Sequence, residues 1–256
     1  MEKSAPPWHH HRMIESLLPP DAAERDRWVR TAARNNASWC EAVCRAHGTP
    51  GAFVEGMWAS AHRTPPLYPD AVTLTPHTAG ADLLARIDTA SPGCSVKDSF
   101  ACLDLTGAGF EVLFEAEWIY RPATLAAPAP VDGVRWDVVR DADALAGWAA
   151  AWGADGNGPF RSELLADEET FFLRGRNGDT VVAGAVASRS ESVVGLSNVF
   201  AADGAARAAW AGVLAAVAER WPGLPVVGYE SGDDLTAAVD EGCLPIGPLR
   251  VWLQAG

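Results

Sequence analysis

Residues 182–253 read VAGAVASRSESVVGLSNVFAADGAARAAWAGVLAAVAERWPGLPVVGYESGDDLTAAVDEGCLPIGPLRVWL. Two apolar runs at the start predict a pair of strands, and the alanine-rich run after them predicts a long amphipathic helix. A strand, a short helix and a last strand complete the order. These predicted elements span Val182–Arg189, Val193–Phe200, Ala205–Trp221, Leu224–Tyr229, Asp233–Val239 and Leu249–Leu253.

The preceding sequence extends this order. Val134–Val139 predicts a strand, Asp141–Trp152 predicts a helix with an apolar stripe, and Thr170–Arg174 predicts the next strand. Asn177-Gly178 is a strong hairpin signal before the strand Thr180–Arg189. In this order of elements, residues 134–256 resemble the acyl-CoA-binding core of the GNAT acetyltransferase family. The resemblance implies an α/β (α+β) fold with a mixed, mostly antiparallel sheet and helices on both faces.

The N-terminal half predicts a helix followed by a similar but shorter order of elements. Asp21–His47 predicts a helix capped by Asp21, but Asn35-Asn36 interrupts its apolar stripe and leaves two helices possible. After it we expect the strand Ala71–Thr75, the helix Ala79–Ile87, and the strands Cys94–Leu105 and Phe110–Arg121 paired as a hairpin. Alternation in the last strand predicts one core face, made of Phe110, Val112, Phe114, Ala116, Trp118 and Tyr120.

These patterns predict two lobes that pack side by side. We expect an N-terminal arm at residues 1–20, a helical segment with a partial GNAT-like lobe at 21–121, and the GNAT-like domain at 134–256. Residues 122–133, rich in alanine and proline, read as the linker between the lobes.

The resemblance implies acetyl-CoA as the cofactor. The family binds the cofactor's pyrophosphate at the N-terminus of the long helix, where backbone N–H groups are free, and passes the pantetheine arm between two splayed strands. In this chain the matching positions are Asn198, Val199, Phe200 and Ala201 on the strand, and Gly204, Ala205, Ala206 and Ala208 after it.

Two residues depart from the family's phosphate-binding pattern. Asp203 stands at the Arg/Gln position, where its carboxylate would repel the pyrophosphate, and Ala206 puts a methyl group at the first Gly position. The alternative interpretation is a structural helix that Asp203 caps and that binds no cofactor.

The candidate catalytic residues are Glu230 and Ser197. By resemblance, Glu230 follows the strand that opens the cofactor channel and would act as a base on an amine; otherwise it is an exposed loop acid. Ser197 and its neighbour Asn198 are polar within an apolar strand, so they either line a substrate pocket or satisfy a bulge. Residues Ser231–Val239 contain neither the Asn after the strand nor the Tyr on the next helix that many active members of the family have.

Charged residues also occur in the two N-terminal strands. Lys97 interrupts the first strand, and Glu115 and Glu117 lie on the second. This pattern predicts either a buried Lys–Glu cluster that marks a cleft or a solvated face with cross-strand ion pairs.

Composition narrows the function classes. A formal net charge of −13 disfavours nucleic acid and anionic membrane partners, and no apolar run is long enough to span a bilayer. The five cysteines are scattered without metal-ligand spacing, so we expect free thiols and no metal. We expect a cytoplasmic acyl-CoA-dependent N-acyltransferase, with acetyl as the acyl group and a small amine as the acceptor. The alternative is a GNAT-like protein that has lost CoA and serves as a ligand-binding or protein-interaction module.

Overall fold

The strands of the chain form a single sheet. The computed structural model describes residues 21–129, 131–154, 158–202 and 204–255, so the predicted arm at residues 1–20 and Asp203 lie outside the described residues. Within those ranges eleven strands follow the order β1-β2-β3-β4-β11-β5-β10-β9-β8-β7-β6. Their bounds are β1 Ala52–Val54, β2 Met57–Ala59, β3 Ala71–Thr73, β4 Ser95–Asp98, β5 Phe110–Arg121, β6 Arg135–Val138, β7 Thr170–Asn177, β8 Thr180–Arg189, β9 Val194–Ala201, β10 Val226–Glu230 and β11 Leu244–Gln254.

Helices cover both faces of this sheet. They are α2 Ala22–Ala46, α3 Gly80–Leu84, α4 Ala142–Trp152, α5 Ala206–Arg220 and α6 Gly232–Asp240, with short 3-10 turns at η1 Thr106–Ala108 and η2 Ser162–Ala166. Val186 of β8 packs with α2 and α4, whereas its neighbours Ala185 and Ala187 pack with α5 and α6. Neighbouring strands pair antiparallel except β9 with β10 and β3 with β4. The predicted fold class is therefore confirmed. Within the described residues, no helix is long and apolar enough to cross a membrane.

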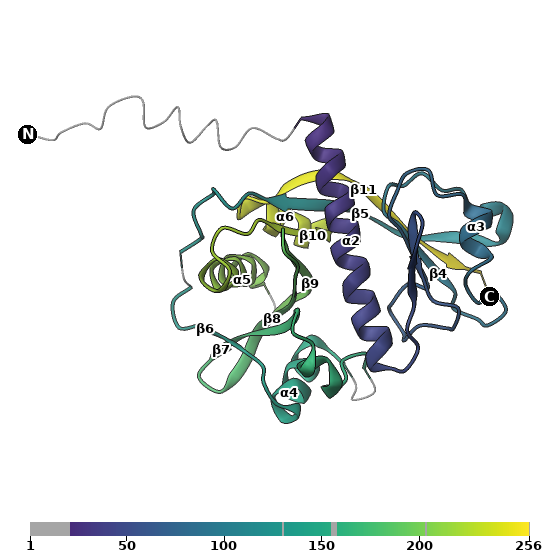
Figure 1. Ribbon diagram of the computed structural model, residues 1–256. Coiled ribbons are helices and arrows are strands. Elements are labelled where there is room, and N and C mark those ends of the chain that lie inside the picture. The colour runs from purple at the N-terminus through teal and green to yellow at the C-terminus, as the bar shows by residue number, and fades with distance from the viewer. Residues whose placement is uncertain (1–20, 130, 155–157, 203, 256) are drawn as a thin grey trace, which may run out of the picture.

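Helix α2 runs unbroken across the sheet between the two parts of the molecule (Figure 1). Asp21 and Glu24 form a capping box at its start, as the predicted N-cap requires. The alternative of two helices is wrong because Asn35 and Asn36 are buried and hydrogen-bonded. The Asn35 amide donates to the Ser188 carbonyl at 2.8 Å, and a Cβ at Gly195 would meet the Asn35 side-chain oxygen at 1.7 Å. Buried polar partners therefore hold the helix tightly against β8 and β9.

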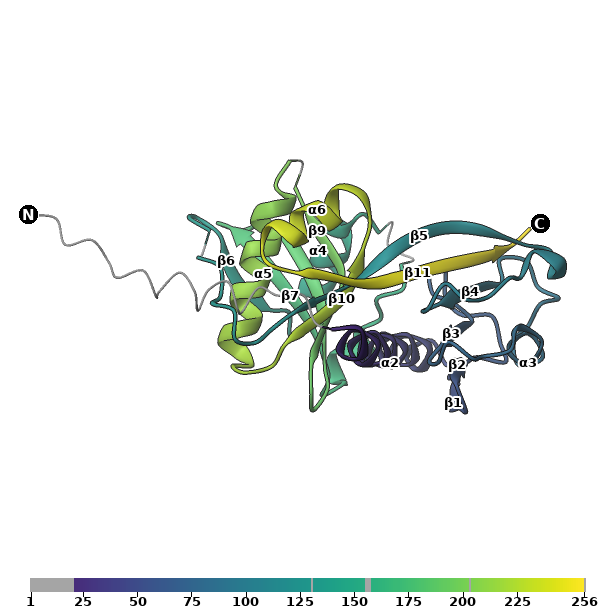
Figure 2. The same cartoon turned by 90° about the horizontal axis from the view of Figure 1, so that it is seen from above.

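The predicted hairpin between the two N-terminal strands is wrong. Strand β11, from the C-terminal end of the chain, lies between β4 and β5 and pairs antiparallel with both. Figure 2 shows β5 and β11 running side by side from one part of the molecule to the other. The first strand ends at Asp98 because its carboxylate accepts hydrogen bonds from the backbone N–H groups of Phe100 and Leu103, which turns the chain away.

The core face predicted for β5 is confirmed only in part. Phe110, Ala116 and Trp118 are buried, but Val112 and Phe114 are 45% and 38% exposed. Residues 116–120 of β5 lie under α2, whose side chains join their cluster, whereas Phe114 borders a cavity instead of a helix. Alternation alone does not show where along a strand the covering helix stops.

Candidate functional site

Strands β9 and β10 run parallel but soon separate. Their paired residues are Val194 with Val226 and Gly195 with Val227. Beyond this point β10 pairs with β5 as far as Glu230, whereas β9 continues along β8 to Ala201. The strands still touch at Gly228, where a Cβ would lie 2.9 Å from the Leu196 carbonyl oxygen. The sheet therefore opens between the C-terminal ends of these two strands.

A β-bulge lies in β9 beside this opening. Gly184 of β8 pairs with Phe200 of β9, and Val186 pairs with Ser197. Two steps along β8 therefore match three steps along β9, which leaves one extra residue in β9. Asn198 has a φ of 53° in this segment, a left-handed conformation that asparagine tolerates better than most residues. The bulge brings Ser197 and Asn198 together onto the wall of a cavity.

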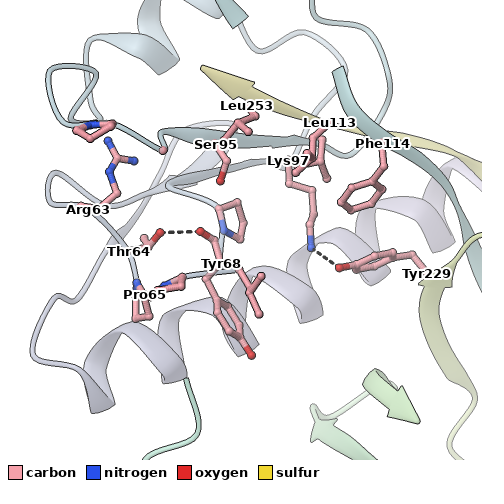
Figure 3. Close-up of a pocket in the computed structure, with 16 residues that line it drawn as sticks. Arg63, Thr64, Pro65, Tyr68, Ser95, Lys97, Leu113, Phe114, Tyr229 and Leu253 are labelled. Carbon is pink, nitrogen blue, oxygen red and sulfur yellow. Dashed lines mark hydrogen bonds between the residues drawn. The ribbon is translucent and has the colours of Figure 1, made fainter. Parts of the chain in front are cut away.

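Two neighbouring cavities lie on the α2 side of the opening. The smaller, of about 50 Å³, is lined by Ser197 and Asn198 and by α2 residues including Asn36 and Cys40. The larger, of about 520 Å³, lies between β4, β5, β11 and the proline-rich loop 63–69 (Figure 3). The residues that line both are Leu67, Tyr68, Pro69, Lys97 and Tyr229. The two cavities therefore adjoin, and Lys97 and Tyr229 belong to the walls of both.

Lys97 stands where the two cavities meet. Its side chain is buried, and its ammonium donates a hydrogen bond to the Asn36 side-chain oxygen at 2.7 Å. It donates a second hydrogen bond, at 3.1 Å, to the Tyr229 hydroxyl (Figure 3). The ammonium also lies 4.2 Å from the centre of the Tyr229 ring, a cation–π distance. Tyr229 is in turn held edge-on by Trp118, with ring centroids 5.5 Å apart. Packing therefore fixes both polar groups in one geometry.

The predicted Lys–Glu cluster is not formed. Glu115 is exposed and pairs with Arg250, directly across the β5–β11 ladder, at 2.6 Å. Among the described residues no carboxylate oxygen lies within 4.0 Å of the Lys97 ammonium. The alternative of a cross-strand ion pair holds for Glu115, while Lys97 faces the opposite, buried side.

The other ionisable groups of the small cavity stay neutral. Burial raises the pKa of the Cys40 thiol, which excludes a ready thiolate nucleophile at neutral pH. Burial, with a smaller contribution from Cys40, raises the pKa of the Tyr68 phenol well above its ordinary value. The chemistry available at the meeting point of the cavities is therefore that of an ammonium, hydroxyl groups and amides.

The architecture is similar to that of several solved structures. It is similar to a GCN5-related N-acetyltransferase from Kribbella flavida, with a TM-score of 0.62 and 18% identity over 88% of this chain and 96% of that chain. The chain has the GNAT fold. A GNAT-family protein from Novosphingobium aromaticivorans (TM-score 0.53, 15% identity, 85% and 99% covered) is similar, as is an N-acetyltransferase-like protein from Streptococcus suis (0.51, 16%, 91% and 100%). No protein-family model and no curated protein sequence matches the chain.

In this structure the two candidate catalytic residues lie on opposite faces of the sheet. Ser197 points to the α2 side, where its hydroxyl lies 3.5 Å from the Asn36 amide nitrogen. Tyr229 faces the same side, so its neighbour Glu230 points away, toward α6. There, burial and the nearby charge of Asp234 raise the pKa of Glu230 to about 8. Glu230 therefore lines neither cavity, and burial favours the protonated form of its carboxyl group.

The predicted cofactor-binding positions follow one another around the opening. Asn198 lines the small cavity, and Phe200 packs its ring against Trp148, with centroids 5.1 Å apart. Val199 contacts the α5 side of the core, and Ala201 pairs with Ala183. Gly204 has a φ of 73°, Ala205 is the N-cap of α5 and offers no side-chain acceptor, and Ala206 and Ala208 lie in the first turn of that helix. The helix N-terminus therefore follows directly after the strand that borders the splay.

Sequence reasoning missed the residues that give this site its character. The sequence places Lys97 only in a Lys–Glu cluster or on a solvated face with ion pairs, and Tyr229 only at the end of a strand. The signal that could have found them is the pair Asn35-Asn36, since two amides within an apolar helix stripe need buried polar partners. Asn36 finds Lys97 and Ser197, from two strands far apart in the sequence.

Proposed function

We propose that this protein is an acyl-CoA-dependent N-acyltransferase that transfers an acetyl group to a small amine. The observation that carries the proposal is that β9 and β10 splay apart beside two adjoining cavities on the α2 side of the sheet. A thioester that enters between the strands reaches Ser197 and Asn198 first. The larger cavity beyond them has room for an acceptor.

In this proposal the cofactor lies along residues that the fold aligns. Backbone N–H groups at Gly204, Ala206 and Ala208 hold the pyrophosphate at the start of α5, whereas the Ala205 N–H already donates to the Ala202 carbonyl at 2.9 Å. The backbone N–H and C=O groups of Asn198–Ala201 form hydrogen bonds with the pantetheine arm. Glu230 points toward α6, outside both cavities, and burial favours its uncharged form.

The transfer needs few groups from the protein. The neutral amine attacks the thioester carbonyl, the N–C bond forms, the C–S bond breaks, and CoA leaves as a thiolate that takes up a proton. The Ser197 hydroxyl supports the carbonyl oxygen as negative charge develops there. Tyr229 accepts a hydrogen bond from Lys97, which leaves the phenol's own proton for the departing thiolate. No carboxylate lines either cavity, so the proton of the amine passes to water.

The second candidate is a GNAT-fold protein that binds a ligand without CoA. Asp203 and Ala206 favour it, because a carboxylate and a methyl group occupy positions where the family presents Arg or Gln and Gly. It keeps the larger cavity as a ligand site and assigns no role to the splay.

Calorimetric titration of acetyl-CoA into the full chain decides between the two candidates. We expect binding by the wild type, and at low salt a several-fold gain for Asp203→Asn, about 1 kcal/mol from removing one partly screened charge. Ser197→Leu should fill the small cavity and lower the affinity at least tenfold, whereas Ser192→Leu, at an exposed position between β8 and β9, should not. Absence of acetyl-CoA binding in the wild type and in Asp203→Asn selects the CoA-free alternative.

A further inference from the structure

Lys97 is a buried cation without an anionic partner. Both of its hydrogen-bond acceptors, Asn36 and Tyr229, are neutral, and no carboxylate of the described residues lies within salt-bridge distance. An ammonium group has three N–H donors, so one remains for another acceptor. A buried charge is costly unless it is paired, which makes this position favourable for an anion.

The larger cavity offers little other polarity. Its walls beyond Lys97 are mostly apolar, with Leu113, Phe114, Val251 and Leu253 on one side and Pro65, Pro66 and Leu67 on the other. Its second cation, Arg63, is neutralised by an ion pair with Asp70 and also donates to the backbone carbonyls of Asp88 and Ser91. Figure 3 shows the Lys97 side chain extending between the two walls toward Tyr229. The cavity therefore combines an apolar body with one uncompensated positive charge.

The rim of the cavity is also apolar. Leu67 is 79% exposed and has a left-handed φ of 74° in a turn that the Tyr68 N–H closes on the Pro65 carbonyl at 3.1 Å, while Leu113 is 54% exposed. A ligand with an extended apolar group would therefore contact apolar side chains all the way from the mouth of the cavity to Lys97.

We propose that this cavity binds an apolar α-amino acid, with its carboxylate on the Lys97 ammonium and its side chain against the apolar walls. The α-amine then lies one carbon from the carboxylate, at the meeting point of the cavities that faces Ser197 and the splay. The amino acid would be the acceptor in the proposed acyl transfer. Only its acylation rests on the proposed function. The binding step stands independently.

The same ammonium favours the reactive form of the acceptor. Pairing with Lys97 offsets the ligand's carboxylate charge, which otherwise stabilises the protonated α-amine, so a larger fraction is the neutral nucleophile. This effect compensates for the lack of a carboxylate base on the cavity walls. An amine without a carboxylate gains nothing from Lys97 and is repelled as a cation.

Binding of two matched ligands tests the proposal without CoA. L-phenylalanine and phenethylamine share the same ring and amine, but only the first carries a carboxylate. In calorimetric titrations of the full chain we expect L-phenylalanine to bind at least tenfold more tightly. Equal affinity, preference for phenethylamine, or no binding of either at millimolar concentration would each overturn the proposal.

Two variants locate the effect on Lys97. Lys97→Met keeps the length of the side chain and should remove the preference for L-phenylalanine, leaving the affinity for phenethylamine unchanged or higher. Arg250→Met removes the same charge from a neighbouring strand outside the cavity and should keep the preference. Retained preference in Lys97→Met, in a protein whose circular dichroism and unfolding midpoint show it folded, contradicts the assignment. If that variant does not fold, the wild-type comparison of the two ligands still decides.

Failure of this inference and failure of the proposed function give different results. Acetyl-CoA binding without selective binding of L-phenylalanine rejects the acceptor and keeps the acyltransferase. Selective binding of L-phenylalanine without acetyl-CoA binding keeps the amino-acid site and rejects acyl transfer. When both bind, formation of N-acetylphenylalanine, followed by mass spectrometry, tests the transfer itself.

Discussion

The Asn36 side-chain oxygen accepts a 2.7 Å hydrogen bond from the Lys97 ammonium and so joins α2 to β4 where the two cavities meet. Through its amide nitrogen the same side chain reaches the Ser197 hydroxyl of β9 at 3.5 Å. One amide therefore connects the helix to both parts of the sheet, which makes its loss a sensitive test of how the site is held.

Removing the Asn36 amide should destabilise the protein through Lys97. Asn36→Leu leaves a buried ammonium with one acceptor fewer, which typically costs about 1–3 kcal/mol of unfolding free energy. Combined with Lys97→Met, the loss should be smaller than the sum of the single changes, because the unpaired charge is gone. Urea unfolding of the three variants measures this, with Ser38→Ala on the exposed side of α2 as the control. Strictly additive losses would show that the two side chains do not depend on each other.

Gly228 should be intolerant of even a methyl group. A Cβ there would lie 2.9 Å from the Leu196 carbonyl oxygen, and backbone cannot easily move aside. We expect Gly228→Ala to lower the unfolding free energy by about 1–3 kcal/mol, the usual range for overpacking. Gly147→Ala, in α4 with open space around it, should instead stabilise by about 0.5–1 kcal/mol. Chemical unfolding compares the two, and equal effects would mean that β9 and β10 do not approach as described.

Glu230 should make stability fall as the pH rises. Its pKa is raised from 4.5 to about 8 in the folded state, so the folded protein binds the proton more tightly than the unfolded chain. The associated stability is complete below about pH 4.5 and is lost as the pH rises through 8. Glu230→Gln should therefore match the wild type in thermal midpoint near pH 5 and exceed it at pH 9.

Asp234 provides the control for this titration. Its charge contributes to the raised pKa of Glu230, after burial, so Asp234→Asn should weaken the pH dependence without removing it. Parallel midpoint curves for the wild type and Glu230→Gln between pH 5 and pH 9 would contradict the burial of the carboxyl group.

Neither half of the chain should fold alone. Strand β5 from the N-terminal half pairs with β10 and β11 from the C-terminal half along most of its length. Residues 1–121 expressed separately would expose both edges of β5, and residues 134–256 would lack the strand that joins β10 to β11. We expect no cooperative thermal transition for either fragment and recovery of one on co-expression. A cooperative transition in fragment 1–121 would establish an independent lobe.

The local elements of the fold were predictable from sequence, and their partners were not. The helices at Asp21–His47 and Asp141–Trp152 and the hairpin at Asn177-Gly178 follow from caps, apolar stripes and turn residues, which act within a few positions. The partner of β5 is not encoded in this way. Its alternation fits β4 and β11 equally well, and the long β11 pairs along nearly its whole length.

The candidate site shows the same division. Sequence pointed to Ser197 and Asn198 because polar residues interrupt an apolar strand, and they line a cavity. It gave no means of deciding that Glu230 faces away from them, since the face of a strand depends on its register and on the layer packed against it.

The sequence by itself determined the order of strands and helices, and with it the fold class, because periodicity, caps and turns are local properties of the chain. Only the tertiary structure decided that β11 separates β4 from β5 and that Asn36, Lys97 and Tyr229 meet beside the splay of β9 and β10. The reason is physical. Lys97 is separated in sequence by 61 positions from Asn36 and by 132 positions from Tyr229, so these contacts depend on how whole layers pack. A buried ammonium finds its partners only once those layers are in place.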